Sequence, residues 1–230
     1  MRSVVVLAVL VGWIGTACVG TSTRYAGYYD RTRHVYVNDA LGFQLLFPGS
    51  WFVATAPQDF TVPLALRADQ VQVLEAYDAV MSVGLVIVIQ QGPLLDIDAL
   101  VQRMQAVPAD QVAQRLASPQ ATDVQQHMVR KTLVNGYEAA EWIYTATDAT
   151  AITPVDVTVS TYILKVSEHY VYLTFSVPTA AATASRAAID AILDTFSRSA
   201  HTGLNIEKRS PAATCLELDR KCIYSAKYLV

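Results

Sequence analysis

Residues 129–177 hold four stretches of strand length separated by turn residues, and this run constrains the fold more than any other part of the chain. Asn135 and Gly136 separate the first two stretches, and both residue types tolerate the positive φ angles of a two-residue hairpin. The stretches 155–165 and 170–177 follow, with a short polar turn between them. The pattern predicts four neighbouring antiparallel strands.

Shorter strands are expected earlier in the chain. The segments 35–37, 43–47 and 51–53 indicate a hairpin followed by a short return strand. The segment 83–89 is a dense run of Val, Ile and Leu, typical of a strand that is buried on both faces. The segment 64–80 is compatible with either a helix or a strand.

Two amphipathic helices are predicted, one before the four strands and one after them. Asp96 is the expected N-cap of the first, whose apolar residues recur at helical spacing: Ile97, Leu100, Val101 and Met104. Pro108 either ends this helix or begins a second one, which would continue to about residue 117. The last helix follows Pro178, with Arg198 near its negative pole. One face of this helix is shared by Ser185, Ile189, Ile192, Leu193 and Phe196, which is a strong amphipathic pattern.

Three short motifs in this order resemble those of the PsbP-like family. They are Leu41-Gly42-Phe43-x-Leu45-x-Phe47-Pro48-x-x-Trp51, then Asn135-Gly136-Tyr137-Glu138-Ala139, and finally Ala191-Ile192-Leu193-Asp194-Thr195-Phe196. The resemblance covers residues 34–200 and implies an α+β fold, an α/β/α sandwich around a central, mainly antiparallel sheet. The family includes an extrinsic photosystem II subunit, a Ran-binding transport factor and many bacterial lipoproteins. The resemblance therefore implies binding to a larger partner rather than chemistry, as an argument from analogy.

The N-terminus has the layout of a bacterial export signal that ends at a cysteine. Arg2 precedes an apolar run, and the small residues of 15–17 lead to Cys18. This resembles the lipobox of bacterial lipoproteins, which implies a diacylglyceryl thioether on Cys18, cleavage before it and an acylated amine. Gly15 stands where that family prefers Leu. Simple secretion after cleavage behind Ala17 and an uncleaved anchor are the alternatives, although the run is shorter than the roughly 20 residues that span a bilayer.

The export signal sets the expected segments of the chain and the interpretation of its cysteines. We expect a signal peptide over 1–17, a tether over 18–33, the folded body over 34–200 and a tail over 201–230. With Cys18 carrying lipid, Cys215 and Cys222 are an even pair in an oxidising compartment, which predicts a disulfide. Two free thiols in the tail are the alternative. Val19, rather than Asp, follows Cys18, which resembles sorting to the outer membrane if the cell has two membranes.

The sequence carries no catalytic signature. It contains no nucleophile elbow, P-loop, zinc-protease motif or dinucleotide-binding motif, and its four histidines are far apart. We therefore expect no metal, no cofactor and no enzymatic activity. The net charge of −3 without a basic cluster does not favour nucleic acid as a partner.

Two hypotheses for the function follow. The first is a lipid-anchored cell-envelope protein, fixed to the membrane through Cys18, that binds or supports a larger protein assembly without catalysis. The second is an envelope protein, anchored or soluble in the periplasm, that binds a small apolar or aromatic ligand. Its binding face would be a tyrosine-lined side of the sheet, formed by Tyr144, Tyr162, Tyr170 and Tyr172. The alternative for these tyrosines is that they pack beneath a helix layer.

Overall fold

The computed structural model describes residues 25–61, 66–92, 94–108, 121–148 and 154–198. The signal segment, Cys18, the cysteine pair of the tail and most of the helix expected over 108–117 lie outside these residues. No helix within the described ranges is both long and apolar enough to cross a membrane.

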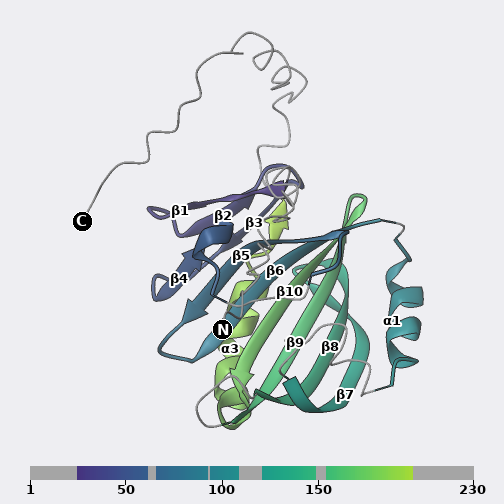
Figure 1. Cartoon of the computed structure of the whole chain (residues 1–230). Coiled ribbons are helices and arrows are strands. Elements are labelled where there is room, and N and C mark those ends of the chain that lie inside the picture. Colours follow the sequence, from purple (N-terminus) through teal and green to yellow (C-terminus); the bar gives the residue numbers. More distant parts are fainter. Residues whose placement is uncertain (1–24, 62–65, 93, 109–120, 149–153, 199–230) are drawn as a thin grey trace, which may run out of the picture.

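A seven-stranded antiparallel sheet is the centre of the fold (Figure 1). Its order is β4-β5-β6-β10-β9-β8-β7. The strands are β4 (Trp51–Ala54), β5 (Gln70–Asp78), β6 (Val83–Gln91), β7 (Ala121–Val134), β8 (Tyr137–Asp148), β9 (Val155–Val166) and β10 (His169–Pro178). The four consecutive strands predicted from the sequence are its β7–β10 half. Asn135 and Gly136 turn β7 into β8 with φ angles of 45° and 83°, as a tight hairpin requires.

A second, four-stranded sheet has the order β1-β2-β3-β11. It comprises β1 (Tyr28–Asp30), β2 (Val35–Asn38), β3 (Phe43–Leu46) and β11 (Ser197–Arg198). The expected hairpin is thus β2–β3, but its expected return strand, β4, joins the central sheet instead. Arg198, expected at the end of a helix, lies in β11.

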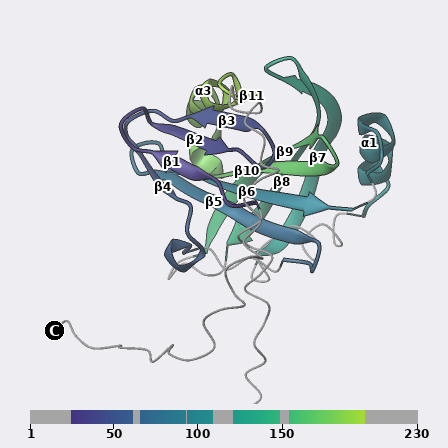
Figure 2. The same cartoon turned by 90° about the horizontal axis from the view of Figure 1, so that it is seen from above.

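Helices cover the central sheet from opposite sides (Figure 2). Helix α1 (Ile97–Gln105) lies against β7 and β8, and its buried residues are the four of the predicted apolar stripe. Helix α3 (Ala182–Leu193), entered through the 3₁₀ turn η3 (Thr179–Ala181), contacts β10 and β3 on the other side. A further 3₁₀ turn, η2 (Pro57–Asp59), follows β4. The α+β sandwich with a mainly antiparallel sheet is confirmed.

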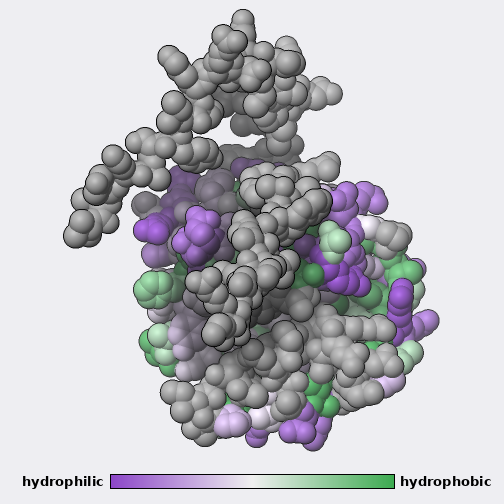
Figure 3. Space-filling model, viewed as in Figure 1, coloured by the Kyte–Doolittle hydropathy of each residue, from purple (hydrophilic) through white to green (hydrophobic). Residues whose placement is uncertain are grey.

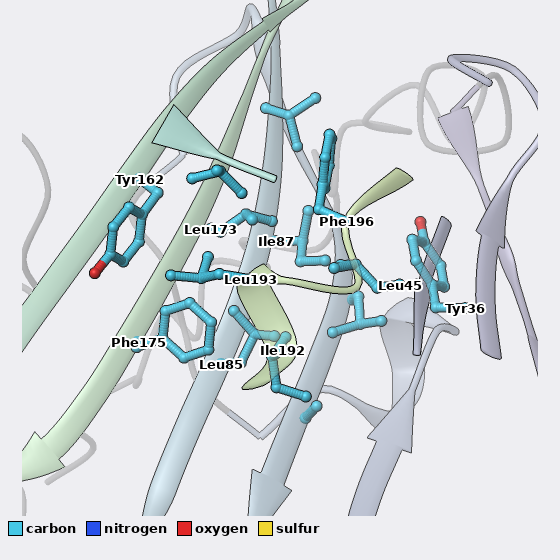
Figure 4. Packing of buried hydrophobic residues seen from close by; sticks show 14 of the residues in the cluster. Tyr36, Leu45, Leu85, Ile87, Tyr162, Leu173, Phe175, Ile192, Leu193 and Phe196 are labelled. Carbon is cyan, nitrogen blue, oxygen red and sulfur yellow. The ribbon is translucent and has the colours of Figure 1, made fainter. Parts of the chain in front are cut away.

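The larger core lies between the central sheet, α3 and the small sheet (Figure 4). Leu85, Ile87, Leu173 and Phe175 come from the central sheet and are fully buried. Alternation along β6 and β10 sends these side chains to one face. There they meet residues of α3, of the segment after it and of the small sheet: Ile192, Leu193, Phe196, Leu45 and Tyr36. A smaller core lies under α1.

The body begins before the expected boundary at residue 34. Tyr25 is 9% exposed, and β1 pairs with β2 along its whole length. Residues 25–33, assigned to the tether from the sequence, therefore belong to the packed body. A three-residue edge strand carries too few alternating residues to produce a recognisable pattern.

Candidate binding surfaces

The four candidate tyrosines do not share one face of the sheet. Tyr172 pairs with Ile163, while Leu173 pairs with Tyr162, so Tyr162 points to the side opposite to Tyr172. The structure brings Tyr144, Tyr170 and Tyr172 together on the α1 side and places Tyr162 on the α3 side.

The three tyrosines on the α1 side are largely covered. Tyr144 and Tyr170 are 2% and 4% exposed and belong to the core under α1. Tyr170 donates a hydrogen bond to the carbonyl of Leu95 at 2.9 Å, and Tyr172 donates one to Gln90 Oε1 at 2.5 Å. Burial raises the pKa of Tyr172 to about 12 and also raises the pKa of Tyr144 and Tyr170. These phenols are neutral hydrogen-bond donors at physiological pH.

Two buried polar atoms on the same side have no hydrogen-bond partner among the described residues. They are Trp142 Nε1 and Gln72 Nε2. Pairing across β5, β6 and β10 places Gln72, Val88 and Tyr172 in one row. Trp142 lies on the same face but on β8, with β6, β10 and β9 between it and Gln72. A buried donor without a partner costs about 1–3 kcal/mol, so a ligand that supplies an acceptor would recover this energy.

On the α3 side, Tyr162 belongs to a polar cluster around a buried carboxylate. Glu141 is fully buried and accepts a hydrogen bond from Tyr162 Oη at 2.9 Å. Arg130 Nε approaches its second oxygen at 2.5 Å, and Arg186 Nη1 lies 3.4 Å from the first. Desolvation and the neighbouring negative charge of Glu141 raise the pKa of Tyr162. The cluster connects β7, β8, β9 and α3, which is a structural role.

The beginning of the described chain is fastened to the far end of the central sheet. Tyr25 Oη lies 3.0 Å from His169 Nε2, and the two rings stack edge to face with centroids 5.0 Å apart. The buried Asn38 donates to the carbonyl of Tyr25 at 2.8 Å. We call these three residues the latch.

A group of exposed apolar side chains, missed by the sequence analysis, lies at the opposite end of the sheet. Phe52 and Tyr77 are register partners on β4 and β5, and Val80 lies in the turn after β5. They are 80%, 46% and 81% exposed. We call these three residues the end patch. Alternation in strands could have indicated that Phe52 faces away from Trp51 and Val53, but not that this side is open.

Metal-ligating side chains do not converge within the described ranges, where no group of three His, Cys, Asp or Glu residues could hold an ion. His34 contacts the hydroxyl of Tyr29 at 3.1 Å, and His169 belongs to the latch.

No protein-family model matches the sequence, and no curated protein does. Solved structures with a similar fold include cyanobacterial PsbP from Synechocystis sp. PCC 6803, with 12% identity, coverage of 79% of this chain and 97% of that chain, and a TM-score of 0.46. The Ran-binding protein Mog1p of Saccharomyces cerevisiae has 9% identity, coverage of 68% and 90%, and a TM-score of 0.41. LpqN of Mycobacterium tuberculosis, involved in cell envelope biogenesis, has 10% identity, coverage of 74% and 94%, and a TM-score of 0.33.

The resemblance to the PsbP-like family is thereby confirmed as a likeness of fold. At these identities and TM-scores it describes the architecture alone and carries no functional argument.

Proposed function

We propose that the chain is a lipid-anchored cell-envelope protein that binds a larger protein assembly and performs no catalysis. The observation that supports this most directly is the latch. Tyr25 is fixed to the body, and only six residues separate it from Cys18. A lipid on Cys18 would therefore hold the body next to the membrane, on the periplasmic face of the outer membrane in a cell with two membranes.

Lipid at Cys18 is tested by metabolic labelling with palmitate. We expect the full chain to incorporate label and its processing to be blocked by globomycin, an inhibitor of lipoprotein signal peptidase. Cys18→Ala should lose both the label and membrane retention, because two or three acyl chains together are needed for stable anchoring. Label that persists in Cys18→Ala would contradict the anchor.

Binding to a protein assembly is tested separately, by isolating the full chain from detergent-solubilised membranes. The expected result is a stoichiometric co-purifying protein that is retained after a second affinity step. A body that elutes as a monomer with no enriched protein would count against this half of the proposal.

Binding of a small apolar or aromatic ligand is a second candidate, favoured by Trp142 Nε1 and Gln72 Nε2 next to the tyrosines of the α1 side. An apolar ligand with a hydrogen-bond acceptor could satisfy one of these two donors, since Gln72 lies on β5 and Trp142 on β8. Native mass spectrometry of protein purified from its own cells would show a bound small molecule, and the candidate fails if Gln72→Leu retains that molecule equally well.

A further inference from the structure

The outer face of the small sheet is apolar. Its side chains that point away from the core include a continuous group on β1, β2 and β3: Tyr28, Val37, Val35 and Leu46. Tyr28 pairs with Val37, and Val35 pairs with Leu46. Tyr28 and Leu46 are 48% and 47% exposed, Val35 is half-buried and Val37 is buried. We call these four residues the sheet face. A solvated sheet face is normally polar, so an apolar one marks a surface for contact with something other than water.

The polar side chains of the same outer face are already hydrogen-bonded. Gln44 Nε2 donates to Ser197 Oγ at 3.2 Å. The carboxylate of Asp30 accepts from the backbone N–H of Thr32 at 2.9 Å and from that of Arg33 at 3.2 Å. Contact with an apolar environment therefore costs less here than it would with unpaired polar groups.

The charged side chains in or beside this sheet have both signs. They are Arg31, Arg33 and Arg198 on one hand and Asp30, Asp39 and Asp194 on the other. Arg33 Nε lies 3.8 Å from Asp30 Oδ2. Figure 3 shows hydrophilic surface at the upper left, where Figure 1 draws β1 and the turn that follows it. Because the two signs balance, these charges select neither an acidic nor a basic partner.

The chain that comes from Cys18 joins the body at this sheet. The carbonyl of Tyr25 is held by Asn38, the last residue of β2, and β1 begins three residues later at Tyr28. Fully extended, the chain from Cys18 to Tyr25 spans at most about 25 Å, and the chain to Tyr28 about 35 Å. A lipid on Cys18 would keep the sheet face within that distance of the bilayer.

A tether of this length makes a weak surface contact effective. It converts the contact into an intramolecular one, with an effective concentration on the order of millimolar for a short linker. The residue types of the sheet face suit the membrane interface. The ring of Tyr28 can lie among the headgroups while its hydroxyl stays in water, and Leu46 and Val35 offer apolar area to the acyl boundary.

We propose that the sheet face rests on the bilayer to which the chain is anchored, through an apolar contact that does not require anionic lipid. The inference rests on the proposed anchor and deepens it, because it states which side of the body meets the lipid. Helix α1 packs on the opposite face of the central sheet and is then turned to the aqueous phase.

The first test measures lipid contact by tryptophan quenching. The full chain with Leu46→Trp is isolated from its own membranes and reconstituted in phosphatidylcholine vesicles whose acyl chains carry bromine. The backbone N–H and C=O of residue 46 both bond to Thr195 Oγ1, so the substitution leaves these bonds in place. We expect about half of the added emission to be quenched, as for a side chain about 5–10 Å deep at the acyl boundary.

The matched control is Leu95→Trp. Leu95 is 36% exposed and precedes α1, and its carbonyl accepts from Tyr170 on the α1 side of the central sheet. The buried Trp51 and Trp142 are common to both variants, and the parent chain gives their contribution. We expect no quenching at position 95. An unquenched position 46, or equal quenching at both positions, would overturn the proposal.

The same measurement tests the kind of contact. Replacement of phosphatidylcholine by phosphatidylglycerol should leave the quenching at position 46 unchanged, because the charges near the sheet face balance. Quenching that appears only with phosphatidylglycerol would contradict an apolar contact.

The second test separates lipid from other occupants of the sheet face. A photoreactive phenylalanine derivative replaces Leu46 in the full chain, expressed in its own cells. We expect lipid adducts, whereas an adduct with another protein or a link to residues 199–230 would overturn the proposal. If palmitate labels the chain but position 46 is not quenched, the anchor stands and this inference fails. If the label is absent and the quenching persists, the anchor fails and the sheet face is still a membrane surface.

Discussion

Glu141 is the common partner of the polar side chains that connect β8 with α3. Its carboxylate is fully buried, and Tyr162, Arg130 and Arg186 all point to it. The two arginine side chains are 53% and 43% exposed, so water can hydrate their guanidinium groups when the carboxylate is removed. These two ion pairs therefore contribute less to the free energy of unfolding than an ion pair with both partners buried.

We predict that Glu141→Gln lowers the free energy of unfolding by about 1–2 kcal/mol, because the amide keeps the bond to Tyr162 but loses the charged partners. Glu138→Gln is the matched control, since Glu138 is exposed and pairs with Lys131 at the surface. It should change the stability by less than about 0.5 kcal/mol. Urea unfolding monitored by tryptophan fluorescence measures both, and equal midpoints for the two variants would contradict this role.

The buried phenols predict a loss of stability in alkali. The pKa of Tyr172 is about 12 in the fold against 10.0 for an unperturbed tyrosine, because burial disfavours the phenolate. The unfolded chain therefore releases its proton first, and stability should fall as the pH rises from 10 to 12. Urea midpoints at pH 9, 10 and 11 measure this slope. Tyr172→Phe should make the decline shallower, and an unchanged slope would show that Tyr172 is accessible to water.

At the scale of elements, helix α1 depends on its N-cap. Asp96 accepts a hydrogen bond from Ala99 N at 2.7 Å, as the sequence predicts. Asp96→Ala should cost about 1 kcal/mol, whereas Asp96→Asn should cost little because asparagine caps equally well. Thermal unfolding followed by circular dichroism compares the two variants. Similar losses for both would mean that the charge, not the cap, is what matters.

The latch depends on a glycine in the segment that precedes β1. A Cβ on Gly27 would lie 2.5 Å from ring atoms of Tyr36, which is fully buried and cannot move aside. Gly27→Ala should therefore release residues 25–30 from the body and speed chymotrypsin cleavage at Tyr25. Gly49→Ala is the control, because its Cβ would meet only His34 at 3.6 Å. Equal cleavage rates for the two variants would contradict the account of the latch.

Sequence patterns predict elements with strong local signals and fail where the partner is remote. Residues that are close together in the sequence determine the Asn135-Gly136 hairpin, the strands around it and the apolar stripe of α1. The segment 64–80 stayed ambiguous because β5 contains an irregularity between Gln72 and Leu74, which interrupts its alternation. That β4 joins the central sheet depends on β5, which follows after a long connection.

At the scale of the whole molecule, the candidate surfaces were the least predictable part. Tyr162 and Tyr172 look equivalent in sequence, yet pairing of β9 with β10 sends them to opposite faces. Phe52 and Tyr77 are 25 positions apart, and only the pairing of β4 with β5 makes them neighbours. The sequence can predict that a strand alternates, but which of its faces is left uncovered depends on where α1 and α3 lie.

The latch and the end patch lie at opposite ends of the molecule. The latch fixes the chain near Cys18 to one end, and the end patch exposes apolar surface at the other. A lipid on Cys18 would make the first end the membrane side.

The most direct measurement of the anchor is the mass of the N-terminal peptide of the mature protein, isolated from membranes. We predict a chain that begins at Cys18 and carries the mass of a diacylglyceryl thioether, with or without a further acyl group on the amine. A peptide that begins at an unmodified Cys18, or one that retains the residues of the signal, would contradict the account.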